Sequence, residues 1–218
     1  MNAKTKKLTM VAMLCAVAYV VVVVVRIPVV LFLKYEPKDV VITIGGFLFG
    51  PLTSFIISAI VSIVEMLTAS DTGLIGCVMN ILGSCSFACT AAWIYKKKHT
   101  LSGAVTGLVC GTFAMTIIML LWNYLITPIY MGYPREAVAE LLIPAFLPFN
   151  LLKGGLNTAL TLLIYKPIVQ ALRKANLVEV PQDSGQRIDN GKKIGLLLIA
   201  FVLLVTCIFF ILVMKGVL

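Results

Sequence analysis

The chain has 218 residues, of which 61% are hydrophobic and 12% charged, and its mean hydropathy is +1.06. These values exclude an ordinary soluble globular domain, in which about a quarter of the residues are charged. The formal net charge of +9 comes from basic residues grouped at the ends of apolar segments. That grouping is typical of membrane topology signals rather than of a nucleic-acid-binding surface. The composition therefore predicts an all-α integral membrane protein.

The first half of the chain predicts four helices and one external loop. A lysine-rich start places the N-terminus in the cytoplasm, and the first helix follows at residues 8–25. Residues 26–39 carry two prolines and several charges, so they predict an external loop that folds back over the protein. A short apolar piece at 40–49, only half a bilayer long as a helix, precedes a Gly-Pro turn. Helices at 52–68 and 74–95 complete this half.

The second half predicts three more apolar helices. The fifth helix, 103–125, leads to an external loop at 127–136 that is rich in aromatic residues and proline. A sixth helix at 143–172 returns to the cytoplasmic side. The polar linker 176–193 then precedes a last apolar run, 194–214, which is long enough to span the membrane once more.

Charge distribution supports this order of crossings. Of the 18 lysines and arginines, twelve fall on the predicted cytoplasmic side, five outside and one within the membrane. Seven crossings from a cytoplasmic N-terminus place the C-terminus outside. We therefore expect a six-helix transmembrane bundle at residues 1–175, a cytoplasmic linker at 176–193 and an additional transmembrane helix at 194–218.

A lysine and two asparagines interrupt the apolar stretch 143–168, at Asn150, Lys153 and Asn157. A lysine near the centre of a transmembrane helix costs roughly 2.5–3.5 kcal/mol on insertion scales, so it needs polar partners. Spacings of three and four residues place all three side chains on one helical face. We expect Lys153 to be functional, because helix bridging does not need an ammonium group.

Other polar side chains lie at a similar predicted depth. For Asn80 and Asn157, bridging between helices is an alternative role, and Glu65 has the alternative of extending to the membrane surface. The inner half of the membrane has almost no such residues, which favours a pocket loaded from outside over a continuous pore. Six polar side chains from five predicted helices share the outer half: Asp39, Glu65, Asn80, Asn123, Asn150 and Lys153.

The residue types at this depth suggest the ligand class. One lysine, several amides and an aromatic rim suit a flat, mostly uncharged molecule that forms hydrogen bonds. Phosphate capture would call for arginines or a glycine-rich turn at a helix N-terminus, and neither is predicted at the pocket. No metal site is expected, since there is no CxxC motif or histidine cluster. Without a P-loop or a catalytic motif, uphill transport would need a partner protein.

Small residues on the first helix form the motif Ala12-x-x-x-Ala16, extended by Ala18. Small residues four apart let another helix approach closely. Packing within the protein is the alternative explanation, since alanine is common in such helices.

At this level of detail the chain resembles the riboflavin-specific substrate-capture subunit, or S component, of energy-coupling-factor (ECF) vitamin transporters. The resemblance covers about residues 7–174. The motifs that carry it are Tyr35-Glu36-Pro37-Lys38-Asp39, Gly45-Gly46-Phe47-x-Phe49-Gly50-Pro51, Glu65, Gly76-x-x-Met79-Asn80, Trp122-Asn123-Tyr124, Pro128-x-Tyr130-x-Gly132 and Phe149-Asn150-x-x-Lys153-Gly154-x-x-Asn157.

The resemblance implies a non-enzymatic, multi-pass protein of a bacterial-type cell membrane. Such a protein needs no cofactor, binds riboflavin from outside beneath the first external loop, and works with a transmembrane coupling subunit and two cytoplasmic ATPases. Docking to the coupling subunit is implied for Ala12 and Ala16. The segment 194–214 departs from the family as a seventh helix. Riboflavin-binding roles are implied for Asp39, Asn80, Asn123, Asn150 and Lys153, with Tyr35, Glu65 and Asn157 as further candidates.

Three other functions remain open from the residues themselves. The same fold could bind another vitamin or a flavin nucleotide, although the absence of arginines speaks against a phosphorylated ligand. A membrane enzyme acting on lipid or isoprenoid substrates would usually show acidic metal motifs, whereas the aspartates here are predicted in scattered loops. A structural scaffold subunit would leave Lys153 unexplained.

Overall fold

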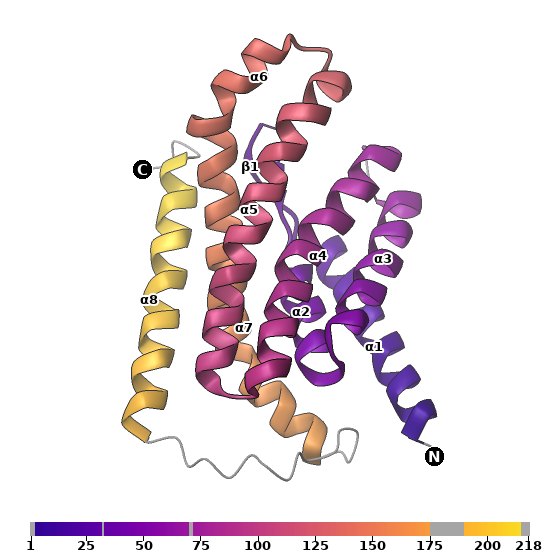
Figure 1. Ribbon diagram of the computed structural model, residues 1–218, viewed down its shortest axis with the longest axis vertical. Helices are drawn as coiled ribbons and strands as arrows, with labels where there is room; N and C mark the ends of the chain where they lie inside the picture. The colour runs from indigo at the N-terminus through magenta and orange to yellow at the C-terminus, as the bar shows by residue number, and fades with distance from the viewer. Residues whose placement is uncertain (1–2, 32, 70–71, 175–189, 215–218) are drawn as a thin grey trace.

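The computed structural model describes residues 3–31, 33–69, 72–174 and 190–214. Six of the helices in these ranges are long and apolar enough to cross a membrane. They run side by side along the long axis of the molecule (Figure 1). Most of the predicted linker 176–193, and the end of the predicted last segment at 215–218, lie outside the described residues.

The predicted first external loop contains a β-hairpin. Helix α1 (Ala3–Val24) leads into β1 (Ile27–Val30), which pairs antiparallel with β2 (Leu33–Tyr35). In β2 the outer two side chains are buried and the middle one, Lys34, is partly exposed, as expected of a strand with one face on the core. As expected, the segment folds back over the protein, and it does so as a hairpin whose buried side chains pack on the bundle.

Three helices follow the hairpin. Helix α2 (Lys38–Phe49) is short, as predicted, and most of its residues are buried. It packs against α1, against α3 (Pro51–Thr68) and against α4 (Gly73–Lys98). Because α2 lies inside the bundle, its first residues bring their charges into the protein interior.

Helix α5 (Leu101–Met131) is longer than predicted and includes the start of the expected external loop. The prediction ended it at residue 125, before an external loop rich in aromatic residues and proline, but the helix continues past Pro128. It ends at Gly132, which has φ 68° and donates its N–H to the Pro128 carbonyl. Lower along α5, Gly107 and Gly111 meet the backbone of α4, where an added Cβ would lie 2.7 and 2.6 Å from carbonyl oxygens.

The sixth predicted helix begins earlier than residue 143. Helix α6 (Arg135–Leu141) continues through a π-helical turn, η1 (Leu142–Phe146), into α7 (Leu147–Lys174). Pro144 lies in this turn and cannot donate a backbone hydrogen bond.

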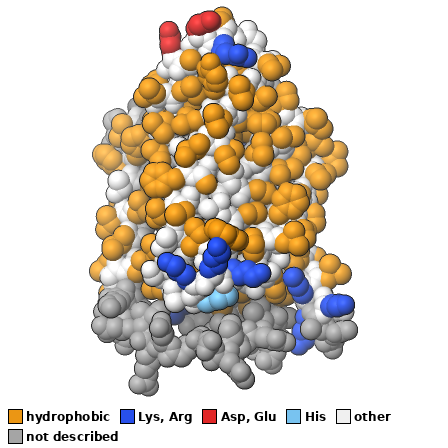
Figure 2. All heavy atoms as spheres, in the orientation of Figure 1, with side chains coloured by type: hydrophobic (Ala, Val, Ile, Leu, Met, Phe, Trp, Pro, Cys, Tyr) orange, Lys and Arg blue, Asp and Glu red, His pale blue; other side chains and the backbone are white. Residues whose placement is uncertain are grey.

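Helix α8 (Asn190–Met214) is the additional apolar helix expected at the C-terminal end. It packs along α7 at one side of the bundle, while α1 lies at the other side (Figure 1). Hydrophobic side chains cover the middle of the visible face, basic ones gather below at the end of α4, and acidic ones lie at the top over α6 (Figure 2). This banding is that of a protein exposed to lipid along its sides.

Candidate substrate-binding site

A pocket of about 200 Å³ lies among the hairpin, α3, α4, α5 and α7. Residues from elements that are far apart in the sequence converge on it, as the predicted depths suggested. Five of the predicted site residues line this pocket: Glu65, Asn80, Asn123, Asn150 and Lys153.

The other three predicted residues, Tyr35, Asp39 and Asn157, belong to a buried polar chain that ends at Lys153. The Lys153 ammonium lies 3.2 Å from Asp39 Oδ2, and Asn157 Nδ2 donates to the same oxygen at 3.2 Å. The Tyr35 hydroxyl donates to Asn157 Oδ1 at 3.1 Å. Ser84 donates to the second carboxylate oxygen of Asp39. Asp39 therefore holds the lysine in place from a position without solvent contact.

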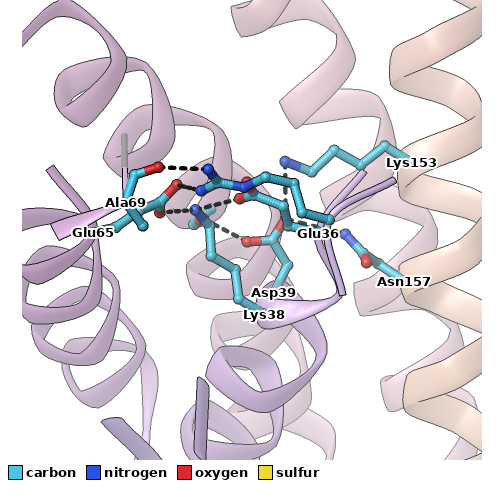
Figure 3. Close-up of polar contacts among 9 residues, drawn as sticks. Glu36, Lys38, Asp39, Glu65, Ala69, Lys153 and Asn157 are labelled. Carbon is cyan, nitrogen blue, oxygen red and sulfur yellow. Dashed lines mark hydrogen bonds and ion pairs between the residues drawn. The ribbon is translucent and has the colours of Figure 1, made fainter. Parts of the chain in front are cut away.

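A second network joins both ends of the hairpin to α2 and α3 (Figure 3). Arg26 forms ion pairs with Glu36 and Glu65, each at 2.8 Å, and donates to the Ala69 carbonyl at 2.6 Å. Lys38, which is fully buried, pairs with the same two glutamates at 2.8 and 2.5 Å. Four side chains of alternating charge, Arg26, Glu36, Lys38 and Glu65, therefore hold the two ends of the hairpin together and attach them to α2 and α3.

Sequence reasoning missed Arg26, Glu36 and Lys38 as parts of the site, because it placed them in an external loop. Ser84 was also missed. One signal could have identified the cations: a glutamate such as Glu65 within a membrane helix needs partners of opposite charge. The nearest candidates along the chain were the charges that flank the hairpin.

The three pocket asparagines differ in their hydrogen bonds. Asn123 and Asn150 are buried, and each donates its amide N–H to the carbonyl four residues earlier on its own helix. Thr127 donates to Asn123 Oδ1 at 2.9 Å. Asn80 is half-buried, and its side chain has no hydrogen-bond partner among the residues that the structure describes. Its amide is therefore the best placed of the three to bond a ligand.

Charge in the two networks is balanced. Three basic side chains, Arg26, Lys38 and Lys153, face three acidic ones, Glu36, Asp39 and Glu65, and each is within ion-pair distance of an opposite charge. Burying an unpaired charge would cost several kcal/mol, so pairing is required at this depth. Together with the amides, this arrangement suits an uncharged polar ligand.

An apolar recess of about 20 Å³ adjoins the pocket between α4 and α5. Thr72 and Met79 line both spaces, and Ile75, Trp122 and Ile126 line the recess. The site therefore offers polar groups on one side and an apolar wall on the other, which matches the usual make-up of small-molecule pockets.

The alanines of α1 fall on two faces. Ala12 and Ala16 are exposed on the outer surface of the bundle, beside Met13 and Val17. Ala18 is fully buried in the core, so it does not extend the exposed small-residue face. The predicted docking residues are thus accessible from outside the bundle.

Comparison with known proteins identifies the family. Residues 6–165 match the family model described as "ECF transporter, substrate-specific component". The riboflavin transporter FmnP of Bacillus subtilis is 31% identical over 80% of this chain and 99% of its own length. A riboflavin transporter RibU from Staphylococcus aureus is 27% identical, over 78% of this chain and 94% of that protein.

A solved structure has the same fold. It is described as the S component of a bacterial ECF transporter, and it superposes with a TM-score of 0.66 at 28% identity. The match covers 78% of this chain and 99% of that one. The chain is therefore a membrane protein of the ECF transporter substrate-specific component family, and it is not an enzyme.

Proposed function

We propose that this chain captures riboflavin at the pocket between the hairpin and helices α3, α4, α5 and α7. The observation that carries the proposal is the pocket itself, in which amides and paired charges surround a space with an apolar wall. Its lining elements lie within the part of the chain that matches the family, and relatives along that part are named riboflavin transporters.

Riboflavin matches these surroundings in its chemistry. Its ring system has one apolar dimethylbenzene edge and one edge of alternating hydrogen-bond donors and acceptors, and its ribityl chain carries hydroxyl groups. Asn80, Asn123, Asn150 and Lys153 supply donors and acceptors to the polar parts. Met79, which lines both the pocket and the adjoining apolar recess, supports placing the apolar edge on that side of the pocket.

The remaining predicted residues have supporting roles in this proposal. Asp39 and Asn157 orient Lys153, and Tyr35 links them to the hairpin. Glu65 holds the ends of the hairpin through its ion pairs with Arg26 and Lys38. The Glu65 side chain also lines the pocket. These residues act by fixing the shape and charge of the site before the ligand arrives.

Transport itself requires partners. We infer a transmembrane coupling subunit, docking at Ala12 and Ala16 of α1, and two cytoplasmic ATPases. The exposed small-residue face and the absence of a P-loop motif from the sequence support this assignment. The lysines at the start of α1 and the end of α4 support a cytoplasmic N-terminus in a bacterial-type cell membrane.

A ligand titration tests the function. Purified full-length protein in detergent should quench the fluorescence of added riboflavin at a one-to-one ratio. It should bind the phosphorylated flavin mononucleotide more weakly, because the cations of the two networks are already paired. Preparations that leave riboflavin fluorescence unchanged would refute the proposal. If flavin mononucleotide binds more tightly than riboflavin, the mononucleotide is the ligand of this pocket instead.

A further inference from the structure

Helix α8 lies outside the part of the chain that defines the family. The family match ends at residue 165. Three curated relatives match over 99%, 94% and 86% of their own length, but over only 80%, 78% and 78% of this chain.

One stripe of α8 is buried against the bundle. Ala200, Cys207 and Ile211, spaced seven and four residues apart, are at most 8% exposed. Gly155 of α7 allows the helices to approach closely, since a Cβ built there would lie 3.1 Å from Cys207 Sγ. Other residues of α8, such as Phe209, are exposed on the lipid side.

The buried stripe reaches the hairpin that covers the site. Cys207 and Ile211 belong to the same hydrophobic cluster as Val29, Leu33 and Tyr35 of the two strands. Tyr35 contributes to this cluster with its ring, while its hydroxyl bonds Asn157. One side chain therefore connects the packing surface of α8 to the polar chain that ends at Lys153.

We propose that α8 is a positioning element of the substrate site, in which Cys207 and Ile211 hold Tyr35 against Asn157. Through the hydrogen bonds of Asn157 and Asp39, this packing fixes the Lys153 ammonium at the pocket. The role rests on the proposed riboflavin binding. It concerns binding rather than docking, since α8 and α1 lie on opposite sides of the bundle (Figure 1).

A pair of tryptophan variants of the full-length protein tests this role. Cys207→Trp inserts a large ring between α8 and the hairpin cluster, whereas Phe209→Trp places a similar ring on the exposed face. The first should weaken riboflavin binding about tenfold, chiefly through faster dissociation. The second should change the affinity less than about twofold. Equal affinities for the two variants would overturn the proposal.

Coupling to Tyr35 distinguishes positioning from general destabilisation. Tyr35→Phe removes the hydroxyl that bonds Asn157 but keeps the ring in the cluster. If α8 acts through this hydroxyl, Cys207→Trp should lose most of its effect on affinity in the Tyr35→Phe background. If the two substitutions lower riboflavin affinity by fully additive amounts, α8 does not act through the Tyr35 hydroxyl.

The position of α8 can be checked without any ligand. Gly155→Cys should form a disulfide with the native Cys207 on mild oxidation, because a Cβ-to-sulfur distance of 3.1 Å is close to the value of about 3 Å in a disulfide. Gly195→Cys, which has no atoms nearby, serves as the control. Failure of Gly155→Cys to cross-link would overturn the inference even if wild-type protein binds riboflavin. Cross-linking without riboflavin binding would instead refute the proposed function and, with it, the role that depends on it.

Discussion

At the residue scale, the central feature of this protein is how a membrane-embedded lysine is compensated. Lys153 is only 14% exposed, and its ammonium faces both the pocket and the buried Asp39 carboxylate. An isolated charge at this depth would be costly, but an ion pair reinforced by hydrogen bonds from Ser84 and Asn157 recovers much of that cost. Lys153 can therefore contact a ligand while remaining oriented by its neighbours.

Removing this lysine should weaken riboflavin binding. Lys153→Ala takes a donor from the pocket and leaves Asp39 without its ion-pair partner. We expect riboflavin affinity to fall by about ten- to a hundredfold, corresponding to roughly 1–3 kcal/mol for a lost buried partner. Titration of purified protein measures this loss. Lys166→Ala, an exposed change on the same helix, should bind like the wild type; unchanged affinity in Lys153→Ala would contradict the binding role.

The Glu65 network should matter for stability as well. Glu65→Gln removes the charge that pairs with both Arg26 and Lys38, so the buried Lys38 and the partly exposed Arg26 would then share Glu36 alone. We expect a clear decrease in the thermal unfolding midpoint in detergent, because breaking a buried pair costs about 3–5 kcal/mol. The exposed Glu136→Gln should leave the midpoint unchanged. Equal midpoints for the two variants would show that the network contributes little.

At the element scale, helix ends were harder to predict than helix cores. The apolar runs correctly located every long helix, but α5 continued past Pro128 and α6 began before residue 143. A proline weakens a helix without always ending it, and glycine in the left-handed region provided the stop at Gly132. The hairpin was missed because its strands are too short to give a clear alternating pattern.

The exposed face of α1 should affect transport and not capture. Ala12→Trp and Ala16→Trp add bulk where the structure leaves the surface open, so the bundle can fold and bind riboflavin normally. We expect riboflavin uptake by cells to fall to background, because close helix approach by a coupling subunit needs small residues. Val202→Trp, on the exposed face of α8, is the matched control and should support normal uptake. Normal uptake by both alanine variants would exclude this face as the docking surface.

At the scale of the whole molecule, the described part of the chain makes seven helical passes along the bundle axis, namely α1, α2, α3, α4, α5, α6 with α7, and α8. An odd number of passes places the two ends of the described chain at opposite ends of the bundle (Figure 1). Lysines at the start of α1 and the end of α4 lie toward the same end. The positive-inside rule then favours a cytoplasmic N-terminus and an external end of α8.

Reporter fusions test this orientation. Alkaline phosphatase, which is active only outside the cytoplasm, should be active when fused after Leu218. The same reporter fused after Lys174, before α8, should be inactive, because an even number of passes precedes that point. Phosphatase activity with the reverse pattern would invert the predicted orientation, and equal activity at both points would mean that α8 does not cross.

Composition and apolar length were enough to establish the membrane class, the long helices and the depth at which polar residues gather, because the bilayer requires apolar segments of a set length. Spacing along one helix was enough to place Asn150, Lys153 and Asn157 on a common face. Only the tertiary structure revealed that Lys153 pairs with Asp39, that Arg26 and Lys38 share Glu65, and that α8 packs on the hairpin cluster. These pairings join segments far apart in the chain, and local periodicity carries no information about which distant partner a buried charge or an apolar face will meet.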